Sequence, residues 1–224
     1  MNIHALRQGL SLVFGLIFLM LWPAQVFAVD SPAPRVIAER LQQEYEATSS
    51  MVADFTQTAS VAMSSRVKHG NGRLVISKPG KIRWDYTAPD RQVLVSDGHK
   101  VSMYFSQSEQ MIVQPINQYL DSDVTYSFFA GTGNILKDFD IFAPDLEAAA
   151  NELAIRLVPK AAHPQVDYLH IWVDAATFLI KRLEIVDQFG SVTDLVFSNI
   201  IYNQAIAPEL FNFTPPEGTE IIEH

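Results

Sequence analysis

The stretch KPGKIRWDY, residues 78–86, determines the fold class of this chain. Pro79-Gly80 is a turn signal, and the residues after it alternate between apolar and polar side chains. Because successive side chains of a β-strand point to opposite faces, one face of this strand carries Ile82, Trp84 and Tyr86. The opposite face carries Lys81, Arg83 and Asp85. The stretch therefore predicts a strand with one apolar face and one solvated face.

Similar segments precede and follow this strand. Strands are predicted near residues 51–61, 69–77, 80–87, 91–96, 99–106, 109–113, 138–142, 152–159, 166–174, 178–187, 191–200 and 210–213, roughly eleven or twelve in all. In the first half the connections are too short for a parallel crossover, so neighbouring strands there are expected to be antiparallel. An amphipathic helix, predicted from residue 36 to about residue 49, precedes the first strand.

The apolar face of such a sheet has to be covered. Met103 and Phe105 continue the apolar row on a later strand. A sheet of this kind can close into a barrel, pack against a second sheet, or be covered by helices. The N-terminal helix and an irregular aromatic segment at residues 115–139, which contains Phe128 and Phe129, favour the third arrangement. We therefore expect a mainly β fold with short helices over an apolar concave face.

Residues 1–28 have the pattern of a cleavable signal peptide. Arg7 is followed by an apolar run from Leu10 to Trp22 and by the small-residue pattern Val26-Phe27-Ala28. The run is shorter than the about 20 apolar residues that a membrane-spanning helix needs, and Pro23 ends it. We expect residues 29–224 to form a single exported domain. Because Val29 and not cysteine follows Ala28, no lipid anchor is expected at the new N-terminus.

Charge and composition exclude several classes of partner and site. The formal net charge is −9, so neither nucleic acid nor an anionic membrane surface is expected to be the primary partner. The chain has no cysteine, which excludes disulfides, thiol catalysis and zinc–thiolate sites.

The sequence also lacks a pattern that predicts catalysis. His69, His99, His163 and His170 have no neighbours that suggest a catalytic or metal-binding group. No phosphate-binding loop, nucleophile elbow or metalloprotease helix motif is present. We therefore expect neither an enzyme nor a metal or cofactor site, and a secreted hydrolase is disfavoured.

Several short motifs, taken in order, resemble the outer-membrane lipoprotein carrier protein (LolA) family. They are Phe55-Thr56-Gln57, Gly72-Arg73-Leu74, Lys78-Pro79-Gly80-Lys81-Ile82-Arg83-Trp84, Leu94-Val95-Ser96-Asp97-Gly98 and Phe211-Asn212-Phe213-Thr214-Pro215-Pro216-Glu217-Gly218. The resemblance implies an unclosed antiparallel β-barrel, a half-barrel, whose apolar concave face is covered by helices acting as a lid. It also implies a monomeric periplasmic chaperone. Such a carrier takes triacylated lipoproteins from an ATP-driven inner-membrane transporter and delivers them to an outer-membrane receptor.

The resemblance also assigns expected roles to residues of this chain. The acyl-chain-binding residues are expected to be Ile82, Trp84, Tyr86, Met103 and Phe105, and the lid residues Phe128 and Phe129. Lys78 stands where the family often has an arginine tied to the lid. Lysine keeps the charge but not the planar fork of donors, so a latch formed by Lys78 would be weaker or differently arranged.

Two other functions of the same fold remain open. One is a periplasmic sensor module that binds lipids or lipoproteins and signals through a partner. The other is an outer-membrane receptor, which would need a lipidated cysteine that this sequence does not contain.

Overall fold

A computed structural model describes residues 31–122, 133–163 and 165–223. The chain divides into two units, Met1–Asp30 and Ser31–His224, and all of the described residues belong to the second unit. No helix in the described residues is both long and apolar enough to span a membrane. The predicted signal peptide and the two predicted lid residues, Phe128 and Phe129, lie outside the described residues.

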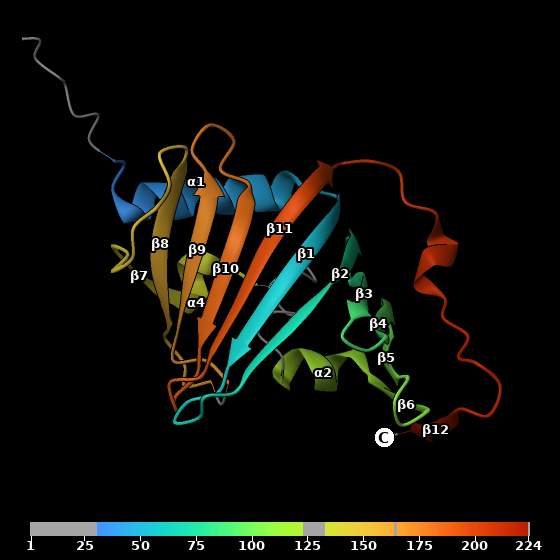
Figure 1. The fold of residues 1–224 in the computed structure, drawn as a ribbon. Helices are drawn as coiled ribbons and strands as arrows, with labels where there is room; N and C mark the ends of the chain where they lie inside the picture. Colours follow the sequence, from blue (N-terminus) through green and yellow to red (C-terminus); the bar gives the residue numbers. More distant parts are fainter. Residues whose placement is uncertain (1–30, 123–132, 164, 224) are drawn as a thin grey trace, which may run out of the picture. The chain divides into compact units, whose positions relative to one another are not determined.

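A single sheet forms the body of this unit (Figure 1), and it contains twelve strands. Its strands are β1 (Ser50–Ser60), β2 (Val67–Ser77), β3 (Lys81–Ala88), β4 (Gln92–Asp97), β5 (Lys100–Phe105), β6 (Gln110–Pro115), β7 (Phe139–Phe142), β8 (Glu152–Pro159), β9 (Tyr168–Asp174), β10 (Ile180–Val186), β11 (Val192–Tyr202) and β12 (Glu220–Glu223). Their order is β12-β6-β5-β4-β3-β2-β1-β11-β10-β9-β8-β7, so the sheet ends in two edge strands and does not close. The predicted mainly β, unclosed barrel is confirmed.

The helices lie on the concave side of the sheet, which we call the inner face. They are α1 (Pro34–Ala47), α2 (Ile116–Ser122) and α4 (Ile135–Asp138). Pro34 begins α1 at a position where its missing N–H costs nothing, and Ile37 and Leu41 of α1 are buried. The main core is formed between these helices and the inner face, and it contains Ile82 and Trp84. The predicted helical cover of the apolar face is therefore confirmed, with α1 two residues earlier than expected.

A second core on the opposite, outer face was not predicted. It contains Val93, Val95, Tyr104 and Phe211, with Phe213 packed against it. The segment after β11, including the 3-10 helix η1 (Pro208–Phe211), crosses the outer face of β3 and β4. The outer face is therefore apolar and covered over these strands, whereas the sequence pattern had indicated that it is solvated.

The C-terminal segment also corrects a strand prediction. Residues 210–213 were predicted to form a strand, but Leu210 and Phe211 belong to η1 and the last strand is β12. β12 runs parallel to β6, and it is the only parallel neighbour among the described strands. The parallel direction is possible because a connection of many residues returns the chain to the edge of the sheet before β12 begins.

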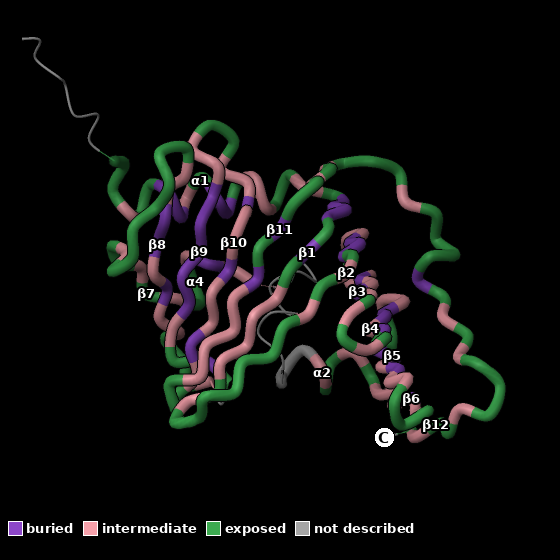
Figure 2. Tube along the Cα trace, viewed as in Figure 1, coloured by how far each residue is buried: buried purple, intermediate pink, exposed green. Residues whose placement is uncertain are grey.

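Figure 2 shows that the buried residues are concentrated in the strands of the sheet. On β3 the buried or partly buried apolar residues are at even positions, and Ile82 has no exposed surface. The alternation of apolar and polar residues in 78–86 therefore predicts correctly which side chains of β3 face the main core.

Candidate functional site

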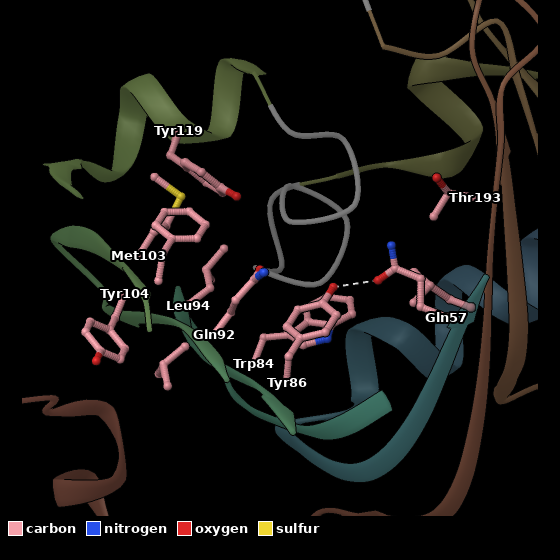
Figure 3. Close-up of a pocket in the computed structure, with 12 residues that line it drawn as sticks. Gln57, Trp84, Tyr86, Gln92, Leu94, Met103, Tyr104, Tyr119 and Thr193 are labelled. Carbon is pink, nitrogen blue, oxygen red and sulfur yellow. Dashed lines mark hydrogen bonds between the residues drawn. The ribbon is translucent and has the colours of Figure 1, made fainter. Parts of the chain in front are cut away.

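A cavity of about 320 Å³ opens on the inner face, in the part of the sheet that α1 leaves uncovered. This volume lies at the lower end of the range of about 300–1,000 Å³ for small-molecule sites. The cavity is lined by residues of six elements: Gln57, Trp84, Tyr86, Gln92, Val93, Leu94, Met103, Tyr104, Phe105, Tyr119, Thr193 and Leu195. Two of them, Val93 and Tyr104, also belong to the core of the outer face, because β4 and β5 border both the cavity and that core. Figure 3 shows Tyr119 of α2 above Met103, with Trp84 and Tyr86 toward β1.

Cross-strand pairing brings the predicted residues together. Trp84 pairs with Leu94 and Tyr86 with Gln92 across β3 and β4. Leu94 and Gln92 in turn pair with Met103 and Phe105 of β5. Directly opposed side chains on one face lie about 5 Å apart, so these pairs form a continuous wall.

Four of the five predicted acyl-binding residues line this cavity, and Ile82 does not. Ile82 lies on the same face as Trp84 but two residues nearer the turn at Gly80, where the main core buries it completely. The role of all five residues in acyl-chain binding remains a prediction.

An aromatic cluster stiffens the wall on the β1 side. The ring of Phe55 meets the rings of Trp84 and Tyr86 edge-on, with centroids 5.3 and 4.9 Å away. Gly72 pairs with both Phe55 and Tyr86 in the sheet, so the two rings meet above a residue without a side chain. A Cβ atom at Gly72 would lie 1.8 Å from the carbonyl oxygen of Asp85, so only glycine fits there.

Polar side chains interrupt the apolar lining. The hydroxyl of Tyr86 donates a hydrogen bond of 2.6 Å to Oε1 of Gln57, drawn in Figure 3. Gln92 and Thr193 also line the cavity. None of these polar lining residues was predicted from the sequence. The position of Gln57 could have been predicted, because it lies two residues after Phe55 and therefore on the same face of the strand.

Lys78 joins the β2–β3 turn to the C-terminal end of α1. Its ammonium group donates a hydrogen bond to the backbone carbonyl of Tyr45 and lies 3.5 Å from the centroid of the Tyr45 ring. Partial burial lowers the pKa of Lys78 to about 8, although the nearby Glu46 carboxylate acts in the opposite direction. This contact is of the kind expected of a latch, and the latch function stays a prediction.

A buried glutamine connects two of the covering helices. Gln42 of α1 accepts a 2.9 Å hydrogen bond from the backbone N–H of Ile135, the first residue of α4. Its side-chain amide donates to Glu46 at 2.8 Å. Because Ile135 is itself buried in the main core, α1 and α4 pack as one cover.

The described residues that line this cavity include no histidine, carboxylate or cationic side chain. None of the four histidines considered from the sequence is among its lining residues. His170 lies on the outer face, where Nδ1 is 3.0 Å from Oε1 of Glu184 and Nε2 is 2.5 Å from Oδ1 of Asp145. Within the described residues, no group of three or more His, Asp or Glu side chains is arranged to hold a metal ion.

Comparison with known proteins is consistent with this site. Residues 46–214 match the family model "Outer membrane lipoprotein carrier protein LolA". A protein of Nitrosomonas europaea named outer-membrane lipoprotein carrier protein is 31% identical over 170 residues, which cover 76% of this chain and 81% of that protein. A protein of the same name from Chromohalobacter salexigens is 33% identical over 191 residues, covering 83% and 86% of the two chains.

The fold is also similar to that of a solved structure. An uncharacterized conserved protein from Thermus thermophilus matches with a TM-score of 0.54 and 12% identity, over 85% of this chain and 98% of that one. This similarity concerns the fold alone. Because the family model covers most of the chain and two relatives exceed 30% identity, the chain belongs to the outer-membrane lipoprotein carrier protein (LolA) family.

Proposed function

We propose that this protein is a periplasmic chaperone that shields the acyl chains of lipoproteins in the cavity of its inner face. The observation that carries the proposal is the cavity itself, a partly open apolar space on a sheet of the LolA family. Its wall combines Leu94, Met103 and Phe105 with the aromatic pair Trp84 and Tyr86. Among the described residues, such a surface offers contacts to hydrocarbon and no histidine, carboxylate or cationic side chain.

The energetics explain why lipoproteins need such a chaperone. Exposing hydrocarbon to water costs about 0.8 kcal/mol per methylene, so one long acyl chain costs on the order of 10 kcal/mol. Three chains on one lipoprotein make free diffusion between two membranes negligible. A protein that covers the chains removes most of this cost without using ATP.

The size of the cavity implies that loading opens it. A volume of about 320 Å³ lies at the lower end of the range for sites that bind one small molecule, whereas a triacylated lipoprotein carries three long chains. Three such chains need more room than a site of this size offers. We infer that the helices on the inner face move away when cargo enters, and that the contact between Lys78 and Tyr45 breaks in that step.

A carrier must also release its cargo. Gln57, Gln92 and Thr193 place polar atoms in the cavity lining, and each of them weakens binding of a hydrocarbon chain compared with a wholly apolar site. We propose that an ATP-driven inner-membrane transporter loads the protein and that an outer-membrane receptor with a more favourable site unloads it. In this scheme the chain acts alone as a monomer and catalyses no reaction.

The test is a release assay with membranes that contain the transporter, lipoproteins and ATP. The protein purified from the periplasm is expected to recover a triacylated lipoprotein in the supernatant. Leu94→Asp, which places a carboxylate in the centre of the cavity wall, is expected to abolish recovery.

Leu146→Asp is the matched control, because Leu146 is an exposed residue outside the cavity. Circular dichroism checks that both variants are folded. If the native protein recovered no lipoprotein, or if folded Leu94→Asp recovered as much as the control, the proposal would be wrong.

A further inference from the structure

Two neighbouring hairpins carry large apolar side chains at their tips. Met63 lies in the β1–β2 hairpin and is fully exposed, and Phe189 lies in the β10–β11 hairpin and is 81% exposed. They are the two most exposed large apolar residues of the described chain. Val61 and Val67, beside Met63, are about half exposed.

The two tips lie side by side. Ser60, the last residue of β1, pairs with Val67 of β2 on one side and with Val192 of β11 on the other. The backbone N–H of Ala62 donates a 3.2 Å hydrogen bond to the hydroxyl of Ser191 across the gap between the hairpins. In Figure 1 both hairpins extend from the same end of the sheet, away from α1.

The hairpins also lie at the cavity's end of the sheet. Gln57, which lines the cavity, is three residues from the end of β1, and Thr193 is one residue from the start of β11. Anything that contacts the tips is therefore close to the cavity.

The backbone conformation of the two turns keeps the side chains of Met63 and Phe189 exposed to solvent. Oδ1 of Asp187 accepts hydrogen bonds of 2.8 Å from the N–H groups of Phe189 and Ser191, which makes this turn rigid. Met63 has a φ of 57°, a left-handed conformation that disfavours residues with a Cβ atom. No packing within the described fold compensates either residue, since both are exposed.

The charge at the tips is opposite to that of the chain. Arg66 and Lys68 are exposed on the β1–β2 hairpin, while Asp187, tied to backbone N–H groups, is the only carboxylate in residues 61–69 and 187–191. The chain as a whole has a formal net charge of −9. The tips therefore attract anions, although the rest of the surface is expected to repel them.

The size of the patch points to a lipid surface rather than a protein. A stable protein interface covers about 800 Å² on each partner, and four apolar side chains on two turns cannot supply that area. Exposed Met and Phe side chains beside cations suit the boundary between headgroups and acyl chains in an anionic bilayer.

We propose that the tips of the β1–β2 and β10–β11 hairpins contact the surface of an anionic bilayer and place the cavity next to it. Met63 and Phe189 enter the headgroup region, while Arg66 and Lys68 contact lipid phosphates. The negative charge of the remaining surface keeps this contact weak and reversible, as a diffusing protein requires. Contact between the tips and a bilayer does not require an acyl chain to be bound in the cavity.

Flotation with lipid vesicles tests the proposal, using the cargo-free protein purified from the periplasm. The protein is expected to bind vesicles of phosphatidylethanolamine and phosphatidylglycerol, to bind phosphatidylcholine vesicles much less, and to dissociate at high salt. Combining Met63→Asn with Phe189→Ser is expected to lower the partition coefficient by about tenfold or more. Arg66→Glu combined with Lys68→Glu is expected to lower it by a similar factor.

Phe142→Ser is the matched control, since Phe142 is 50% exposed on β7 and lies outside the tips. It is expected to leave partitioning unchanged. The proposal is overturned if the native protein does not bind the anionic vesicles, or if the Met63/Phe189 variant binds them equally well.

The Met63/Phe189 variant could also bind anionic vesicles normally but fail to recover lipoproteins from transporter-containing membranes. That outcome would assign the tips to a protein partner and overturn the lipid proposal. Binding of a fluorescent fatty acid in vesicle-free solution is expected to be the same in all variants, which separates this test from that of the cavity.

Discussion

Replacing Lys78 by methionine is expected to stabilise the fold at neutral pH and to lose that advantage at high pH. The ammonium group of Lys78 is half-buried between the β2–β3 turn and α1, beside a small apolar pocket of about 30 Å³. The carbonyl of Tyr45 also accepts a hydrogen bond of 3.3 Å from the N–H of Thr48, so it keeps a partner when Lys78 is removed. Methionine fills the same space without a charge.

The magnitude follows from the pKa of Lys78. Burial lowers this pKa from 10.5 to about 8, which means that the folded state disfavours the charged form. At about 1.4 kcal/mol for each pH unit between the two values, the cost in full would be about 3 kcal/mol. Because the group is only half-buried, solvent screening reduces this to about 1–2 kcal/mol.

The sign of the pH dependence is set by proton binding. Between pH 8 and pH 10.5 the unfolded state holds more protons on Lys78 than the folded state, so the native protein gains stability as pH rises through this range. Below pH 8 the cost is present in full, and above pH 10.5 it is absent. Lys78→Met should therefore be more stable by about 1–2 kcal/mol at pH 7 and no more stable at pH 11.

Urea unfolding of the two proteins at a series of pH values, followed by circular dichroism, measures this difference. Other titrating groups are common to both proteins and cancel. A difference that stays constant from pH 7 to pH 11, or a native protein that loses stability relative to the variant over that range, would refute the reasoning.

Two other substitutions test the packing of the sheet. Gly72→Ala is expected to cost about 3 kcal/mol in urea unfolding, because its Cβ would lie 1.8 Å from the Asp85 carbonyl oxygen. Gly70→Ala should cost clearly less, because its Cβ would lie no nearer than 3.3 Å to the Tyr86 ring and 3.6 Å to the Ala88 carbonyl oxygen, and equal costs for the two variants would contradict this explanation. His170→Leu is expected to cost about 2 kcal/mol, because the Glu184 carboxylate loses a hydrogen-bond partner while it is only 14% exposed. Adding Glu184→Gln should recover part of this loss, and no recovery would show that the carboxylate is not its source.

Much of the sheet was predictable because its signal is local. The alternation in residues 78–86 places Ile82, Trp84 and Tyr86 on one face, and the structure buries or half-buries all three there. The same rule found the row of Met103 and Phe105 on β5. Turn residues between closely spaced segments predicted antiparallel neighbours, and β1 to β6 are paired in that way.

The C-terminal segment was not predictable in the same way, because its partners are distant in sequence. Phe211 and Phe213 pack against the second core, which includes Tyr104 about a hundred residues earlier. Judged from the sequence alone, the apolar residues Phe211 and Phe213 had the pattern of one more strand. The parallel pairing of β12 with β6 likewise depends on the path of the chain over the outer face.

For the candidate site, the sequence indicated which face of the sheet is apolar. It did not indicate which part of that face is filled by the core and which part lines the cavity. Ile82 and Trp84 are equivalent in the alternation, yet Ile82 is fully buried in the main core whereas Trp84 also lines the cavity. Gln57 and Thr193 join the cavity because β1 pairs with β2 and with β11 at once.

The sequence by itself determined which residues share a face, that the chain contains no cysteine for a lipid anchor or thiol chemistry, and the family motifs in their order. The period of a strand is a local property, so it can be read without a structure. Only the tertiary structure decided where the apolar face is filled, where it stays open, and that Lys78 reaches Tyr45. The physical reason is that apolar burial has no direction, so a sequence predicts that a side chain is buried but not which element buries it.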